Sequence, residues 1–267
     1  MNVRGSLVKS SEVNEERKVS VNDRGGKINS KKNIARMAGF LYLVVALVGI
    51  FSLMYVPTTL IVPGDAATTA STIMASEGLF RMGLVGEAVV FLVEVVLVVL
   101  LYVLLKSVSE TLSLVAALSR LSMAAVQGVN VLIGFAALLL LSGAGYLTVF
   151  GPEQLHALAL LFLDLRNAGI FVWEAVFGLH LFVLGYLFVK SGYIPRILGI
   201  MLVIASFGYL IHSFGNFLFP DYQAIFEWIV IALAIVPELS LTLWLLIRGA
   251  EVPQQEKEGL LSPLPRH

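Results

Sequence analysis

Cysteine is absent from this sequence, and charged residues are scarce. The absence of cysteine excludes disulfide bridges, thiolate zinc sites and cysteine nucleophiles. Charged residues make up only 13% of the 267 residues, whereas hydrophobic residues make up 58%, and the mean hydropathy is +0.90. A soluble domain is about half apolar and about a quarter charged. A chain this apolar cannot bury its side chains in one aqueous core, so the composition indicates a membrane protein.

The motifs of soluble nucleotide-dependent and hydrolytic enzymes are also missing. The sequence has no GxxxxGK(S/T) loop, no GxGxxG after a strand, no GxSxG elbow and no HExxH zinc motif. We therefore assign no cofactor, no metal site and no catalytic residue from the sequence. The N-terminal basic region lacks interleaved aromatic residues, so we expect no nucleic-acid partner.

Six apolar stretches are long enough to cross a bilayer, which needs about 20 residues per helix. They cover residues 37–56, 81–105, 119–142, 167–189, 197–218 and 224–247. Proline and glycine mark the breaks, with Pro57, Pro63 and Gly64 expected to close the first span. The predicted fold class is therefore all-α, a polytopic transmembrane helical bundle of six spans. We find no internal repeat.

The charges are distributed unequally between the two ends of these spans. Every lysine lies on one side if the N-terminus is cytoplasmic, including Lys106 and Lys190 in the loops after spans two and four. The opposite loops are acidic, and Asp65 and Asp221 lie there. This is the positive-inside asymmetry, so we expect both termini in the cytoplasm. Trp173 and Trp228 are expected near the outer interface, and Trp244 near the inner one.

The regions outside the spans divide the chain into three parts. Residues 1–33 are basic and polar without periodicity, which predicts a disordered cytoplasmic tail able to contact anionic headgroups. Residues 34–249 form the six-helix domain, and residues 250–267 a short polar cytoplasmic tail. On the outer surface, residues 65–76 are expected to form a short helix with Asp65 as its N-cap. Residues 152–165 are expected to lie on the outer leaflet as an amphipathic helix that bends near 167–169.

Ionisable residues inside a span are costly, and each is a candidate functional group. Helical spacing places them on stripes that contain small residues, so we expect these stripes to face the bundle interior. The candidates for ligand or proton binding are Glu87, Glu94, Glu174, His212 and Glu238, with Asn130, His180 and Asn216 as weaker candidates.

Two arginines near these groups have simpler interpretations. Arg120 is expected to reach the inner headgroups, and Arg166 to lie at the outer interface. The deep carboxyl groups would then have no cation at their depth, and protonation, a histidine partner or a bound cation would have to compensate them. We expect the five main candidates to form one cluster whose titrations influence one another.

Several separate runs resemble a known family of membrane proteins. They are Ile61-Val62-Pro63-Gly64-Asp65-Ala66-Ala67, Phe177-Gly178-Leu179-His180, Gly192-Tyr193-Ile194-Pro195-Arg196-Ile197-Leu198-Gly199 and Leu239-Ser240-Leu241-Thr242-Leu243-Trp244-Leu245-Leu246. These runs resemble the bacterial family called domain of unknown function 4386, and the similarity extends from about Ile34 to Gly249. The resemblance implies a single helical domain in a bacterial inner membrane. It assigns no activity and no site residue.

Three classes of function remain open at the level of sequence. The leading hypothesis is a bundle with an acidic, outward-opening intramembrane cavity that binds or passes a small solute, a cation or a proton. The second is a membrane-embedded enzyme that uses the Glu/His cluster on a lipid or another membrane substrate. The third is a structural or sensory protein in which the polar groups only link helices. The substrate and the oligomeric state are not predicted.

Overall fold

The computed structural model describes residues 30–251, and throughout this range the secondary structure is helical, without strands. Six helices are long and apolar enough to cross a membrane. They are the first span Ser30–Leu60, α4 (Glu77–Leu105), α5 (Glu110–Leu140), α6 (Pro152–Ser191), α7 (Arg196–Leu218) and α8 (Gln223–Ile247). The prediction of an all-α bundle with six spans is confirmed, and the protein is a multi-pass membrane protein.

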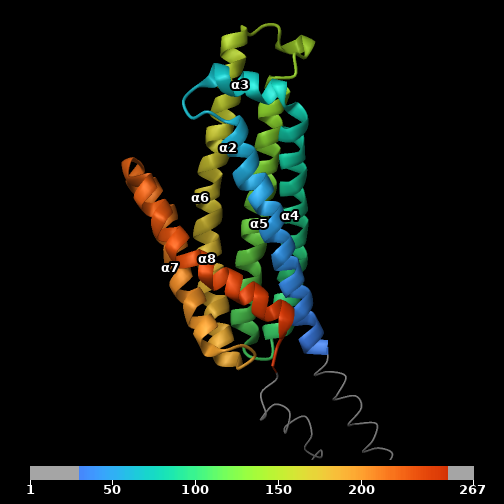
Figure 1. Ribbon diagram of the computed structural model, residues 1–267, viewed down its shortest axis with the longest axis vertical. Helices are drawn as coiled ribbons and strands as arrows, with labels where there is room; N and C mark the ends of the chain where they lie inside the picture. The colour runs from blue at the N-terminus through green and yellow to red at the C-terminus, as the bar shows by residue number, and fades with distance from the viewer. Residues whose placement is uncertain (1–29, 252–267) are drawn as a thin grey trace, which may run out of the picture.

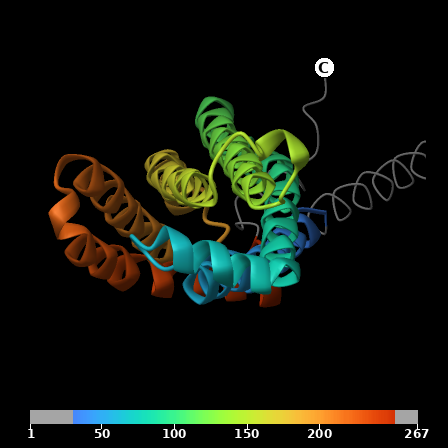
Figure 2. The ribbon, with the colours of Figure 1, turned by 90° about the horizontal axis from the view of Figure 1, so that it is seen from above.

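The helices run alternately up and down (Figure 1). Ser30 and Glu251 consequently lie at one end of the bundle, which we call the terminal end, and the short helix α3 (Ala66–Ala75) lies at the other, the distal end. Seen from the distal end, the α7–α8 hairpin projects sideways from the other helices (Figure 2). An even number of spans brings both ends of the described chain to the same end of the bundle. The predicted tails lie almost entirely outside the described residues, although helix is already present at Ser30.

Apolar residues both fill the interior and cover the outside of this bundle. A large core cluster, including Met123, Leu184 and Leu245, occupies the terminal half, and a smaller one around Ile73 and Leu84 lies near the distal end. Many large apolar side chains on the outer surface are nevertheless exposed. Such a surface is unfavourable in water but suits a lipid environment, which supports the membrane assignment.

A close helix crossing joins α6 to α7 through two glycines. A Cβ atom added to Gly185 would lie 2.6 Å from the Gly199 carbonyl oxygen, and one added to Gly199 would lie 2.8 Å from the Gly185 carbonyl oxygen. Both distances are too short for a side chain at either position. The absence of side chains therefore allows the two backbones to touch, as at other small-residue crossings in membranes.

The prediction for residues 152–165 is wrong. Instead of an interfacial helix that bends near 167–169, this segment is the first part of α6, a continuous helix of 40 residues. At about 1.5 Å per residue, α6 is far longer than the bilayer is thick and extends beyond it at the distal end. The apolar face packs inside the protein, because Ala159, Leu160 and Leu163 are buried and α3 contacts α6.

The helix predicted after Asp65 is confirmed as α3. The Asp65 carboxylate accepts hydrogen bonds from the Thr68 backbone nitrogen at 2.9 Å and the Thr68 hydroxyl at 2.7 Å. These bonds favour the ionised form and lower the pKa of Asp65 below its usual value of 3.8. Thr72 of α3 also donates to the Leu60 carbonyl at 2.6 Å, which fixes α3 to the end of the first span.

The first span does not end at Pro57 as predicted. A π-helical segment, η1 (Ile50–Tyr55), precedes α2 (Val56–Leu60), and Pro57 lies in the first turn of α2. Pro57 has no amide hydrogen to donate, and the π-helical segment directly before it is where the regular α-helical hydrogen bonds are already interrupted. The helix therefore continues to Leu60.

Candidate functional site

A buried guanidinium joins four helices in the terminal half of the bundle. Arg120 of α5 is only 1% exposed. Its Nε lies 2.6 Å from Oε2 of Glu94 on α4, and its Nη1 donates to the hydroxyl of Tyr42 on the first span at 2.9 Å. The same Nη1 lies 2.9 Å from Nε2 of His180 on α6. Arg120 is thus the central residue of an intramembrane polar network.

The contacts of His180 define its tautomer. Arginine can only donate hydrogen bonds, so Nε2 of His180 must accept from Arg120. The other ring nitrogen, Nδ1, lies 2.8 Å from the Ala116 carbonyl and must carry the hydrogen. His180 is therefore neutral in this arrangement, and a proton added to Nε2 would displace Arg120.

A second carboxyl group lies close to Arg120. Glu238 of α8 accepts a hydrogen bond from the Tyr209 hydroxyl of α7, with an oxygen–oxygen distance of 2.6 Å. Glu238 is also near enough to interact electrostatically with both Arg120 and Glu94. Arg120 is therefore ion-paired with Glu94 and is also close enough to influence the charge of Glu238.

A histidine–carboxylate pair lies nearer the distal end, between α6 and α7. Nδ1 of His212 is 2.5 Å from Oε2 of Glu174, and both residues are buried. The edge of the Phe171 ring packs against the imidazole, and the Asn216 side chain donates to the His212 carbonyl at 2.7 Å. Nε2 of His212 has no hydrogen-bond partner among residues 30–251. A carboxylate on Nδ1 with a free Nε2 is an arrangement that suits proton exchange.

Aromatic side chains occupy the space between the His212 pair and the Arg120 network. Tyr209 packs edge-on against Phe177, with 4.8 Å between ring centroids, and against Trp173 at 6.5 Å. Phe177 in turn stacks on Trp173 at 4.8 Å and on His180 at 6.0 Å. Tyr209 also interacts electrostatically with Glu174. Tyr209 lies three residues before His212 on α7 and donates to Glu238, so it lies near both groups.

Glu87 belongs to a separate pair. Its Oε1 forms a buried ion pair with Arg166 of α6, and its Oε2 accepts a hydrogen bond from Gln127 of α5 at 3.0 Å. Asn130 of α5 packs against Gly169, where an added Cβ would clash with the Asn130 side-chain oxygen. The polar stripe of α5 is thus buried against α4 and α6.

One expectation about a cation is therefore wrong: Arg120 does not reach the headgroups, because it is buried and paired with Glu94. Arg166, which was expected at the outer interface, is likewise buried within the protein and paired with Glu87. The spacing of residues on α5 could have indicated that Arg120 faces the interior, since Arg120 lies on the same stripe as Gln127 and Asn130. The pairing across helices, however, depends on the packing. Sequence reasoning also missed Tyr42 and Tyr209, because tyrosine is common near membrane interfaces without a specific partner.

The five main candidates are distributed over several contacts. Glu94 pairs with Arg120, Glu238 accepts a hydrogen bond from Tyr209, Glu174 and His212 pair with each other, and Glu87 pairs with Arg166. Among residues 30–251, no group of three or more Cys, His, Asp or Glu side chains is arranged to hold a metal ion. The arrangement can bind and transfer protons, because it combines a neutral histidine, two tyrosine hydroxyls and a carboxyl group without a bonded cation.

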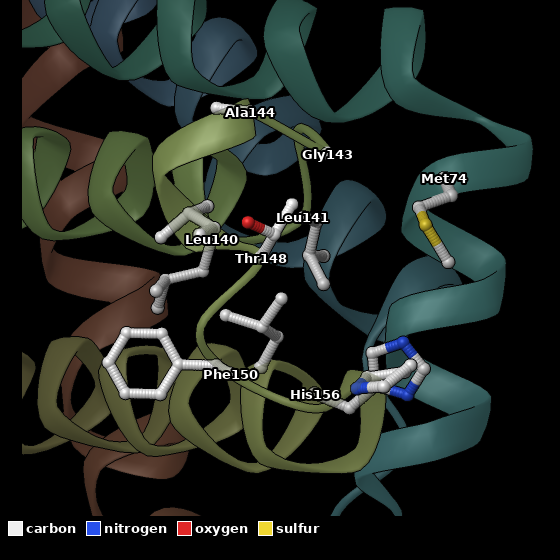
Figure 3. A pocket seen from close by; sticks show the side chains of 11 residues that line it. Met74, Leu140, Leu141, Gly143, Ala144, Thr148, Phe150 and His156 are labelled. Carbon is white, nitrogen blue, oxygen red and sulfur yellow. The ribbon is translucent and has the colours of Figure 1, made fainter.

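A pocket at the distal end contains none of these residues. It has a volume of about 280 Å³ and is lined mainly by apolar side chains from α3, the end of α5, the following loop and the start of α6. Figure 3 shows Met74 and His156 on the same side of this pocket. The pocket is separate from the polar network.

Comparisons with known proteins match most of the helical body. The profile of the family described as "Domain of unknown function (DUF4386)" matches residues 37–249. An uncharacterized protein of the archaeon Archaeoglobus fulgidus is 33% identical over 134 residues, which cover 50% of this chain and 67% of that protein. No solved structure matches. The resemblance noted from separate sequence runs is confirmed.

Proposed function

The chain belongs to the family described as domain of unknown function 4386, and on that premise we propose, from its own residues, that it binds and passes protons within the membrane. The family description assigns no chemistry, so the proposal rests on the side chains described above. The sequence left a small solute, a cation and a proton as possible ligands, and of these we propose the proton.

The observation that carries the proposal is the sharing of Arg120 by Glu94 and Glu238. In a low-dielectric interior, one guanidinium compensates one carboxylate. The second carboxylate, on the partly buried Glu238, would be a charge without a bonded cation, which is relieved by protonation. The Tyr209 hydroxyl bond to Oε1 of Glu238 leaves Oε2 available for that proton. The group of Glu94, Arg120 and Glu238 therefore constitutes a site for one exchangeable proton.

The neighbouring residues suggest a route to this site. A proton taken up at Nε2 of His212 would be delivered through the Glu174 pair toward Tyr209 and Glu238. From there the proton would reach Glu94, the carboxyl group paired with Arg120, while the guanidinium keeps its charge. Asn216 would hold the backbone next to His212. Glu87 and Asn130 would have supporting roles, because Arg166 already compensates Glu87.

The orientation forms part of the proposal. Among residues 30–251, the exposed bases lie mostly at the terminal end, where they include Lys106, Lys190 and Arg196, and the distal loops carry Asp65 and Asp221. The positive-inside rule then places the terminal end in the cytoplasm and the distal end outside. His212 would face the outer side of a cytoplasmic membrane.

The test is proton flux through the purified protein in liposomes that enclose a pH-sensitive dye. With a potassium diffusion potential imposed by valinomycin, liposomes containing the protein should acidify faster than empty liposomes. Glu238→Gln should abolish the difference, because glutamine keeps the hydrogen-bond acceptor for Tyr209 but cannot carry the proton. Glu77→Gln is the matched control, since Glu77 is exposed and paired only with Arg81 at the helix start.

Equal acidification by wild type and Glu238→Gln would contradict the proposal. Carboxyl groups that are inaccessible to water and exchange no proton would instead favour a structural protein in which the polar groups only link helices. Turnover of a membrane lipid that depends on Glu174 and His212 would favour the enzyme.

A further inference from the structure

The three helices that run toward the terminal end finish with the same five-residue pattern. Each has an aromatic residue, three apolar residues and then a base. The segments are Tyr102–Lys106 at the end of α4, Tyr186–Lys190 at the end of α6 and Trp244–Arg248 at the end of α8.

In all three segments the base lies over the aromatic ring. The Lys106 and Lys190 ammonium groups are 6.0 and 5.7 Å from the ring centroids of Tyr102 and Tyr186. The Arg248 guanidinium carbon is 5.9 Å from the Trp244 ring. A spacing of four residues places both members of each pair on one helix face. The contact holds a long, flexible side chain against its helix and thereby reduces the entropy lost on binding an anion.

The three bases are exposed and available to a ligand. Among residues 30–251, none of them forms an ion pair with a carboxylate. The α4, α6 and α8 helices occupy different positions around the rim, with α5 packed between α4 and α6 (Figure 2). The pattern therefore supplies three separate cationic positions at the level where a helix leaves the hydrocarbon.

Stabilisation of the helix ends does not account for the whole pattern. A base in the last turn interacts favourably with the negative end of the helix dipole, but this effect requires no aromatic residue. Arg196 lies at the same end of the bundle, at the start of α7, and has no ring beneath it in the described structure. The rings are found where a helix emerges from the bilayer with a base at its end.

We propose that each aromatic–base pair binds the phosphate of an anionic phospholipid in the leaflet at the terminal end. The ring would lie at the level of the glycerol and headgroup region, and the base above it would contact the phosphate oxygens. The three lipids would fix the depth and tilt of α4, α6 and α8, which carry Glu94, His180 and Glu238. This site is independent of the proposed proton binding and concerns a different ligand.

The test counts bound lipids by native mass spectrometry of the full chain, released from nanodiscs of phosphatidylcholine with phosphatidylglycerol. The wild type should retain up to three phosphatidylglycerol molecules. Lys106→Gln, Lys190→Gln and Arg248→Gln should each remove one, with affinity for that lipid falling about fivefold or more, as expected for one base near an anionic surface. These bases are exposed, so the substitutions preserve the fold.

Two controls separate a specific site from general attraction. Arg196→Gln removes the same charge from the same end but no aromatic–base pair, and should leave all three lipids bound. Tyr186→Leu keeps Lys190 but removes its ring, and should release one lipid. Glycerol 3-phosphate in excess should not displace the lipids if the acyl chains contribute, whereas displacement would identify a site for free phosphate esters and overturn the lipid assignment. Equal loss in Arg196→Gln and Lys190→Gln would show only diffuse attraction and would also overturn the proposal.

Discussion

Removing Arg120 should destabilise the protein more than removing either of the carboxyl groups that it serves. Loss of one partner from a buried ion pair costs about 3–5 kcal/mol, because it leaves an uncompensated charge. Arg120→Gln would leave both Glu94 and Glu238 without a cation and would weaken the hydrogen bonds to Tyr42 and His180. We therefore expect a loss at or above the upper end of this range.

Glu94→Gln should be milder, because Arg120 would still have Glu238 as its counter-charge. We expect a loss of about 1–3 kcal/mol, which is typical for a disturbed buried hydrogen bond. The double variant Arg120→Gln/Glu94→Gln should be more stable than Arg120→Gln alone, because it also removes a carboxylate that would otherwise lack its counter-charge.

The assay is reversible unfolding of the purified protein in mixed micelles with increasing dodecyl sulfate, followed by tryptophan fluorescence. An exposed substitution, Arg196→Gln, serves as the control. If Arg120→Gln were within about 1 kcal/mol of wild type, or if Glu94→Gln were the less stable single variant, the shared-cation interpretation would be refuted.

Further predictions follow from the other contacts. Gly199→Ala should lower the free energy of unfolding by about 1–3 kcal/mol in the same assay, because its Cβ would press on the Gly185 carbonyl; Gly78→Ala, which has open space around it, should cause no loss. Asp65→Ala should increase amide exchange in the first turn of α3, as loss of the bonds to Thr68 removes its cap. The Asp65 contribution should be fully present above the usual pKa of 3.8 and lost as the pH falls through the lowered folded value, so exchange that is insensitive to acid would contradict it. Reporter fusions at Lys106, Lys190 and the C-terminus should be cytoplasmic, and those near Asp65, Ser142 and Asp221 external; an external C-terminus would exclude the proposed orientation.

The sequence was sufficient for the fold where hydrophobicity alone determines the outcome. The six spans follow from runs of apolar residues, and the helix after Asp65 follows from its capping chemistry. The continuous α6 was not predictable in this way, because an apolar face fits equally well against a lipid surface or against α3. Only the packing of Leu160 and Leu163 distinguishes these two environments.

The candidate site was partly predictable for a similar reason. Helical spacing correctly placed Glu87, Glu94, Glu174 and His212 toward the interior, where they are buried. Spacing along one helix does not reveal a partner on another helix, so the pairing of Arg120 with Glu94 and of Arg166 with Glu87 was missed. Long arginine side chains were assigned to headgroups because they commonly extend toward them. In this bundle, buried carboxyl groups provide stronger partners.

The central claim is that Glu94 and Glu238 share one guanidinium and therefore hold one exchangeable proton. Infrared difference spectroscopy of the protein in lipid, titrated with acid and base, measures this directly through the carboxyl C=O band. We expect one protonated carboxyl group near neutral pH, whose band disappears in Glu238→Gln and also in Glu94→Gln, because Arg120 then compensates the one carboxylate that remains. The control Glu77→Gln should leave this band unchanged. A wild-type spectrum with no protonated buried carboxyl group, or identical spectra for wild type, Glu94→Gln and Glu238→Gln, would contradict the claim.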